Sequence, residues 1–265
     1  MLTEQQVNHF ETFGMLLLRQ LFSPAEMEEI TAEAEAVWRE DLVSQPEGQG
    51  HQHVVPFLEK RPLLARLPED DRIYLPIQQL LGPGFVWGGS EGNKGSFNET
   101  RDHQWHSDRA GQIALQYTRI KIMIYLQAMT KDTGALRVIP GSHHAAFHQE
   151  LLRLQPQQQQ TSRAAFGVGG PELCCHPLEV EPGDIVLFNH YLFHAVYGKQ
   201  EERSYVAMKF AAEPVTETQI EALRAHGQDA SALDGAFRHS QRPRIRGMVD
   251  KLLEWERELG VAAPG

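Results

Sequence analysis

A histidine and an aspartate stand two positions apart at His106 and Asp108, within the run Gln-Trp-His-Ser-Asp of residues 104–108. Side chains of an extended segment alternate between two faces, so these two point the same way. An imidazole and a carboxylate that converge on one point can hold a metal ion, with a third ligand supplied by another strand. Two histidines and one carboxylate with open coordination positions form the facial triad of non-haem Fe(II) oxygenases.

The third ligand has two candidates, His190 and His194, in the late segment 183–194. The early His-x-Asp pair is weak evidence alone, because 13 histidines in 265 residues give such pairs by chance and polar surfaces carry them too. Three features strengthen the metal-site hypothesis. Trp105 and the polar strand that follows look like a pocket wall, His194 ends a late strand, and Arg203 comes after a predicted chain reversal.

Arg203 suits a cosubstrate with a carboxylate at each end. A 2-oxo acid fills two open positions of a facial-triad iron and O₂ fills the third, so 2-oxoglutarate would still carry a distal carboxylate. A buried arginine binds such a group well, because its planar fork makes two parallel hydrogen bonds. We expect residues 193–196 and 204–211 to form an antiparallel hairpin, which places Arg203 beside His194. The alternative is a surface ion pair with the neighbouring Glu201 or Glu202.

Composition narrows the class of protein. The 265 residues are 41% hydrophobic and 23% charged, as in ordinary globular proteins. A net charge of −10 argues against general nucleic-acid binding, which needs a basic face. No apolar run approaches the length that spans a bilayer, and residues 1–6 lack the pattern of a signal peptide. The two adjacent cysteines, Cys174 and Cys175, favour reduced thiols in a cytoplasmic protein over a disulfide or a zinc site.

The elements that must position these residues follow a simple order of helices, short strands and helices again. Apolar periodicity, caps and turn residues predict helices over 4–13, 23–40, 73–81, 144–154, 216–225 and 244–258. They predict strands over 15–19, 85–97, 119–127, 178–180, 185–188, 193–196 and 204–211. Short strands with Gly and Pro turns indicate a mainly β sandwich or jelly roll with flanking helices. We expect one domain over 1–265, with helical flanks at about 1–45 and 214–265.

The segment 119–127 has the clearest strand pattern. Its isoleucines at every second position form one face, whereas the other face carries Arg119, Lys121, Met123 and Tyr125. This mixed face could line a water-filled cavity next to the metal ligands, or it could be a solvent-facing edge. The alternation pattern does not distinguish these two positions.

Several of these motifs resemble one enzyme family. The motifs are His106-Ser107-Asp108, Asp132-Thr133-Gly134-Ala135-Leu136, Pro140-Gly141-Ser142-His143, Gly183-Asp184, His194 and Arg203. Together they resemble the phytanoyl-CoA dioxygenase family of Fe(II)/2-oxoglutarate-dependent oxygenases, over roughly residues 4–212. One departure is Val196, at a position where many members have serine.

The resemblance implies a double-stranded β-helix, the cupin-like jelly roll, with the metal ion between its two sheets. It implies that His106, Asp108 and His194 are the Fe(II) ligands and catalytic residues, and it favours His194 over His190. It implies that Arg203 pairs with the distal carboxylate of 2-oxoglutarate. Further cosubstrate contacts are expected from three polar side chains, Lys121, Tyr125 and Thr133.

The implied reaction is hydroxylation of a small-molecule metabolite by O₂, with release of succinate and CO₂. In related halogenases a small residue replaces the carboxylate ligand, so Asp108 argues for hydroxylation or another oxidation without halide. Trp105 and Arg109 are candidates for contacts to the primary substrate, whose identity the sequence does not reveal. One alternative is a cupin-type isomerase, hydrolase or sensor without 2-oxoglutarate chemistry, which needs no arginine near the metal. Another is a non-catalytic binding module that has lost its metal affinity.

Overall fold

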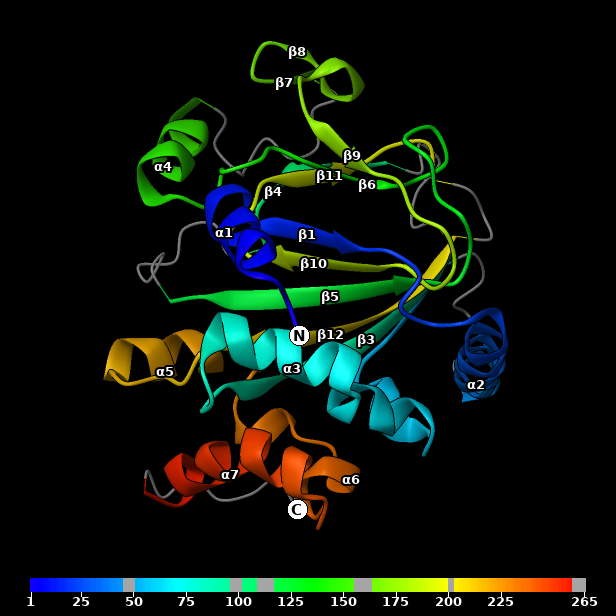
Figure 1. Cartoon of the computed structure of the whole chain (residues 1–265), viewed down its shortest axis with the longest axis vertical. Helices are drawn as coiled ribbons and strands as arrows, with labels where there is room; N and C mark the ends of the chain where they lie inside the picture. The colour runs from blue at the N-terminus through cyan, green and yellow to red at the C-terminus, as the bar shows by residue number, and fades with distance from the viewer. Residues whose placement is uncertain (45–50, 96–101, 109–116, 155–163, 200–202, 259–265) are drawn as a thin grey trace.

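The computed structural model describes the chain except for residues 45–50, 96–101, 109–116, 155–163, 200–202 and 259–265. Two antiparallel sheets face each other in the described part (Figure 1). The larger sheet has the order β1-β10-β5-β12-β3-β2. Its strands are β1 (Met15–Leu18), β10 (Ile185–Asn189), β5 (Arg119–Tyr125), β12 (Ser204–Ala211), β3 (Val86–Gly95) and β2 (His51–Val54). The smaller sheet is formed by β4 (His103–His106), β11 (His194–Val196), β6 (Leu136–Val138) and β9 (His176–Leu178). This arrangement confirms the expected jelly roll.

Helices from both ends of the chain cover the outer face of the larger sheet (Figure 1). They include α2 (Pro24–Ser44), α3 (Asp71–Leu81), α7 (Pro243–Glu258), and the short η1 (Leu58–Lys60) and η2 (Leu64–Glu69). The others are α1 (Glu4–Phe13), α4 (Ala145–Leu154), α5 (Glu217–Arg224), α6 (Gly235–Arg238), η4 (Gly170–Glu172) and η5 (Ala230–Ala232), and a small ribbon pairs β7 (Ala164–Ala165) with β8 (Val168–Gly169). None of the described helices is long and apolar enough to span a membrane.

The ends of the first helix follow directly from its sequence. The Thr3 hydroxyl accepts a hydrogen bond from the Gln6 N–H, and the Gln6 side chain accepts one from the Thr3 N–H. Gly14 ends the helix with φ of +79°, a conformation that costs glycine little. The predicted helix 4–13 and strand from Met15 are therefore both confirmed.

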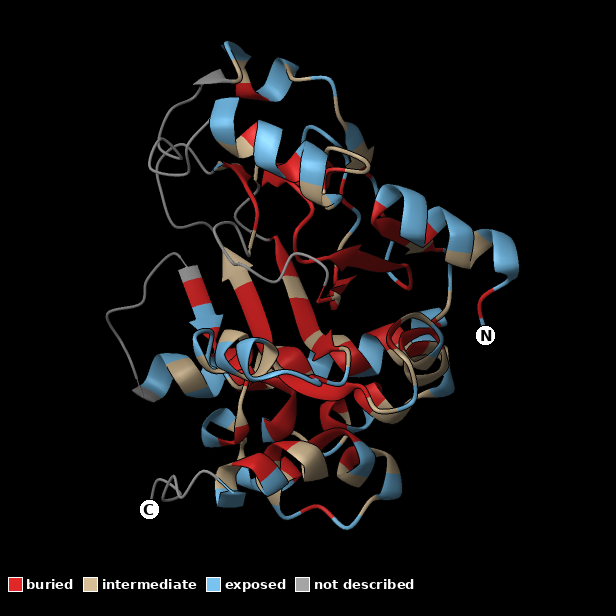
Figure 2. Ribbon diagram, turned by 90° about the vertical axis from the view of Figure 1, so that its left-hand side faces the viewer, coloured by how far each residue is buried: buried red, intermediate tan, exposed pale blue. Residues whose placement is uncertain are grey.

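Strand β5 lies inside the larger sheet, between β10 and β12, and all its residues are buried. Its isoleucines pack with the helices on the outer face, while Met123 and Tyr125 pack between the two sheets. Figure 2 shows the buried strands enclosed by helices whose outer surfaces are exposed. The mixed face of the strand is therefore not a solvent-facing edge, and its polar side chains point into the interior of the jelly roll.

The turn before β10 is fixed by the buried carboxylate of Asp184. Its oxygens accept hydrogen bonds from the backbone N–H groups of Gln20, 2.9 Å away, and Glu181, 3.0 Å away, and from the Arg19 side chain at 2.7 Å. Burial opposes ionisation, but these donors outweigh it and lower the pKa of Asp184. The carboxylate thus joins the end of β1 to the start of β10.

The predicted hairpin of residues 193–196 and 204–211 is wrong. β11 pairs with β4 and β6 in the smaller sheet, whereas β12 pairs with β3 and β5 in the larger one. The chain crosses from one sheet to the other between them. Period-2 alternation assigns side chains to faces but does not say which strands pair, so it does not distinguish a hairpin from a crossing between two sheets. Strand β2 was also missed, because its surroundings are rich in proline and glycine.

Candidate metal centre

Three side chains converge between the ends of β4 and β11. His106 and His194 are directly opposite each other in the antiparallel register, and their ring centroids are 4.2 Å apart. Asp108 lies in the turn after β4, with Oδ1 3.5 Å from Nε2 of His106 and 3.6 Å from Nε2 of His194. One ligand atom from each residue lies within 4.8 Å of the others, and no other such group occurs among the described residues.

Both imidazoles are oriented for metal binding. Nδ1 of His106 lies 2.7 Å from the Gln104 carbonyl, and Nδ1 of His194 lies 2.9 Å from the Leu192 carbonyl. Because a carbonyl only accepts, each Nδ1 carries the proton and each Nε2 has a free lone pair toward Asp108. Burial and the nearby His106 lower the pKa of His194 to about 3, so its ring is neutral at physiological pH.

The third group is a charged carboxylate. Burial works against ionisation of Asp108, but the Lys121 ammonium, with Nζ 3.9 Å from Oδ2, and His194 hold the pKa of Asp108 well below its usual range. Two imidazoles and one carboxylate on one side of a point are the donor set of a facial triad. The residues present therefore fit a divalent iron ion.

The structure places His194, and not His190, in the cluster with His106 and Asp108, although His190 lies close enough to Asp108 to contribute to the lowering of its pKa. His190 lies in the turn after β10, where its backbone N–H donates to the Arg119 carbonyl at 3.0 Å. It therefore stays with the larger sheet, whereas His194 opens a strand of the smaller sheet beside His106.

Arg203 faces the triad across a cavity of about 210 Å³, which is also lined by Asp108 and His194. The guanidinium is 6% exposed, donates to the Gly134 carbonyl at 2.9 Å and to the Tyr125 hydroxyl at 3.2 Å, and lies over the rings of Tyr125 and Tyr205. No carboxylate of a described residue lies within ion-pair distance of it. The alternative partners, Glu201 and Glu202, lie outside the described residues.

Gly134 allows this close approach. Its φ is +108°, and a Cβ atom at this position would lie 2.8 Å from Cδ of Arg203. A side chain here would therefore displace the arginine as well as strain the backbone.

Of the other candidate residues, some lie at the cavity and others point away from it. Lys121 lines the cavity, and Tyr125 contacts it through Arg203. Thr133 does not reach it, because its hydroxyl accepts from the Thr130 N–H at 2.8 Å within a surface turn. Trp105 also points away: it donates to the Gly170 carbonyl at 2.9 Å and packs on the face of β4 opposite His106. Arg109 lies outside the described residues.

Lys199 is a cavity residue that the sequence did not reveal. It lies in the connection between β11 and β12, which the sequence marks only as a polar reversal. Burial and the neighbouring charge of Arg203 lower the pKa of Lys199 to about 8. Two cationic side chains thus share a cavity that ends at the triad.

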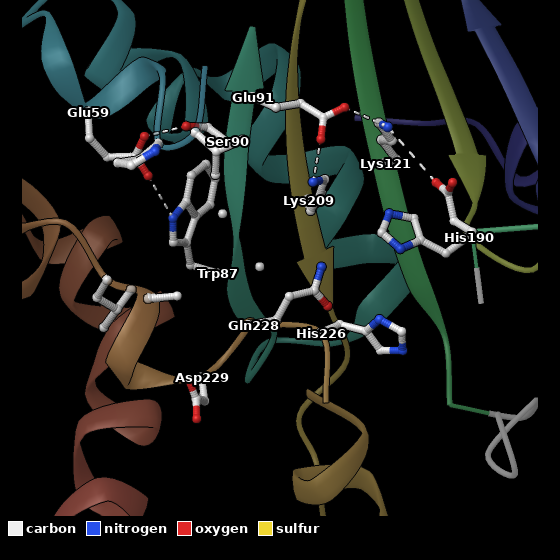
Figure 3. Close-up of a pocket in the computed structure, with 18 residues that line it drawn as sticks. Glu59, Trp87, Ser90, Glu91, Lys121, His190, Lys209, His226, Gln228 and Asp229 are labelled. Carbon is white, nitrogen blue, oxygen red and sulfur yellow. Dashed lines mark hydrogen bonds and ion pairs between the residues drawn. The ribbon is translucent and has the colours of Figure 1, made fainter. Parts of the chain in front are cut away.

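A second cavity, of about 270 Å³, lies on the other side of Asp108 and Lys121, which line both (Figure 3). Glu91, in the wall of this cavity, forms one ion pair with Lys121 at 2.7 Å and another with Lys209 at 2.5 Å. These three residues come from the adjacent strands β3, β5 and β12. The arrangement provides two separate chambers that meet at one metal-binding point.

Comparison with known proteins adds a family match. Residues 10–199 match the model of the phytanoyl-CoA dioxygenase (PhyH) family. The ectoine dioxygenases of Bordetella bronchiseptica and Bordetella parapertussis are each 27% identical over 155 residues, which are 54% of this chain and 50% of theirs. The chain thus spans about half the length of the curated relatives it matches.

Solved structures share the fold. HygX from Streptomyces hygroscopicus, solved with nickel and 2-oxoglutarate bound, has a TM-score of 0.63 and 19% identity over 82% of this chain and 89% of its own. EctD from S. alaskensis, solved with bound Fe, has a TM-score of 0.59 and 21% identity over 80% of this chain and 77% of its own.

Proposed function

The chain belongs to the phytanoyl-CoA dioxygenase (PhyH) family, and from this premise we propose that it is an Fe(II)- and 2-oxoglutarate-dependent dioxygenase. It hydroxylates a small-molecule metabolite with O₂ and releases succinate and CO₂. The observation that carries the proposal is the convergence of His106, Asp108 and His194 opposite Arg203, a buried cation without a described acidic partner. HygX, solved with nickel and 2-oxoglutarate bound, and EctD, solved with bound Fe, support the same assignment.

Bound Fe(II), with 2-oxoglutarate and O₂, supplies the oxidising chemistry. The two histidines and Asp108 would hold the ion, and both cavities border this cluster at Asp108. Arg203 binds the distal carboxylate of 2-oxoglutarate, and its contacts with Tyr125 and Gly134 fix the guanidinium in advance. Lys121 balances the charge of Asp108 and keeps this carboxylate ionised.

The proposal is tested by calorimetry on anaerobic protein loaded with Mn(II), a redox-inert substitute for Fe(II). We expect one 2-oxoglutarate to bind per chain, and binding to disappear when a chelator removes the metal. With Fe(II) and O₂, the protein should release succinate faster when a suitable substrate is added. A metal-loaded protein that binds no 2-oxoglutarate would contradict the assignment.

Lys199 provides a prediction about pH. Val196 cannot offer the hydroxyl that many family members place there, so we expect Lys199 to supply the second contact to the distal carboxylate. The pKa of Lys199 is about 8. Its ammonium is therefore charged below this pH and lost above it, and affinity for 2-oxoglutarate should fall as the pH rises through about 8. Replacing Lys199 with glutamine should weaken binding by about tenfold at neutral pH and remove this dependence.

The other groups around Lys199 do not produce the same change. His103 is neutral, with its pKa lowered to about 2, and burial raises the pKa of Tyr205 to about 12, so neither changes its charge near pH 8. The matched control is Lys131→Gln, which removes an exposed lysine paired with its neighbour Asp132. If Lys199→Gln keeps both the wild-type affinity and its pH dependence, Lys199 does not contact the cosubstrate.

A further inference from the structure

The second cavity has the position of a substrate chamber. It shares Asp108 and Lys121 with the cavity of Arg203 but extends in another direction, toward η1 and the segment 226–233 (Figure 3). A molecule in it would lie beside the metal-binding point without displacing a cosubstrate held by Arg203. The inference below rests on the proposed function and concerns what this chamber selects.

Most acidic groups of the chamber already have a positive partner. Lys121 and Lys209 flank the carboxylate of Glu91 and hold the pKa of Glu91 well below its usual range, although burial opposes ionisation. Asp108 faces Lys121 and the two histidines. Asp229 accepts from the Ser231 backbone at 3.2 Å, and Arg224 lies 3.9 Å from it.

Glu59 is different. Its carboxylate is 7% exposed, and no lysine, arginine or histidine of the described chain lies within ion-pair distance. One oxygen accepts from the Trp87 indole N–H at 3.1 Å, and the other accepts from the Ser90 hydroxyl. Ser90 is itself held by the backbone N–H groups of Phe57 and Leu58. These contacts fix the carboxylate at the chamber wall but leave its charge unbalanced (Figure 3).

An unbalanced carboxylate in this position favours a cationic ligand. Burial raises the pKa of Glu59, which means that its charged form lacks the stabilisation that water would give. The contacts to the carboxylate come from neutral donors, namely the Trp87 indole, the Ser90 hydroxyl and the backbone N–H of Glu59 itself, so none of them supplies a positive charge. A positively charged N–H group in the chamber would supply this missing charge.

We propose that this chamber binds the primary substrate and selects a small molecule with a positively charged nitrogen, an ammonium or amidinium group, which Glu59 recognises. The indole of Trp87 keeps the carboxylate in place from one side, and Gln228 and Asp229 line the chamber from the C-terminal segment (Figure 3). The oxidised carbon then lies on the part of the substrate nearer to Asp108. Glu59 is thus a specificity-determining residue.

The test measures binding to anaerobic protein loaded with Mn(II) and 2-oxoglutarate, so that no turnover is needed. The probes are putrescine, agmatine and L-ornithine at millimolar concentration, each compared with an N-acetylated form that has lost one cationic nitrogen. Ligand-observed NMR or calorimetry should show at least one amine binding about tenfold or more tightly than its acetylated form. Equal binding of both forms, or no binding of any amine, would overturn the proposal.

Glu59→Gln is the decisive variant, because an amide oxygen can still accept from Trp87 while the charge is lost. We expect the preference for the amine to disappear and 2-oxoglutarate binding to stay unchanged, which separates this proposal from the proposed function. The matched control is Glu69→Gln, on the neighbouring η2, where Arg242 already balances the carboxylate at 2.5 Å. If the Glu59 variant keeps the amine preference, the recognition residue is another one. The comparison in the wild-type protein remains decisive even if the variant folds poorly.

Discussion

Replacing Arg203 with alanine is expected to weaken 2-oxoglutarate binding by about a hundredfold or more, because removing one partner of a buried charge pair leaves the other uncompensated. Metal binding should be unchanged, since Arg203 does not contact the triad and is bound to Gly134 and Tyr125 instead. The measurement is calorimetry of 2-oxoglutarate with Mn(II)-loaded protein, together with a separate metal titration. Arg203→Lys should be intermediate, because it keeps a charge but loses the planar fork.

Arg137 is a matched control for this experiment. It is also buried, donates to two backbone carbonyls, those of Pro171 and Lys131, and lies over the ring of Tyr197. It lines neither cavity. Arg137→Ala should therefore lower the free energy of unfolding without changing the affinity for 2-oxoglutarate. If both arginine variants bind the cosubstrate equally well, Arg203 is structural and the reaction class must be reconsidered.

The convergence of the candidate metal ligands could be predicted because its signals are local or depend on chain order. The i, i+2 spacing of His106 and Asp108 needs only the geometry of an extended chain, and it holds although Asp108 lies just beyond the end of β4. The relation of Arg203 to His194 was expected from a hairpin that does not exist. The two residues nevertheless line one cavity, as expected. The reason is that the chain crosses between two facing sheets and both side chains point into the space between them.

What the sequence did not reveal depends on packing between distant segments. Glu59 lies in a proline-rich stretch without periodicity, and it reaches the second cavity only because η1 packs against β3. Lys199 lies in a connection whose path depends on which sheet each neighbouring strand joins. Trp105 is another case. Alternation along β4 already places Trp105 on the face opposite His106, so the expected contact of Trp105 with the substrate conflicts with the same alternation rule that groups His106 with Asp108.

Replacing His194 with alanine is expected to reduce metal affinity by more than about a hundredfold. Removing a residue that only hydrogen-bonds to a metal ligand already lowers metal affinity by up to about a hundredfold, and losing a ligand itself should cost more. His190→Ala should bind the metal like the wild-type protein. The two histidines are four positions apart and both buried, so the pair compares the same change in similar surroundings. The measurement is a titration with Mn(II) followed by electron paramagnetic resonance, with circular dichroism to check that each variant is folded.

The two outcomes differ because the histidines belong to different sheets. The backbone of His190 is bonded to Arg119 at the end of β5, while His194 begins β11 directly opposite His106. The Leu192 carbonyl orients the His194 ring. A different side-chain rotamer of His190 would not bring its backbone to the smaller sheet. If His190→Ala abolishes metal binding and His194→Ala does not, the ion must lie in the second cavity, and the assignment of the two chambers would have to be reversed.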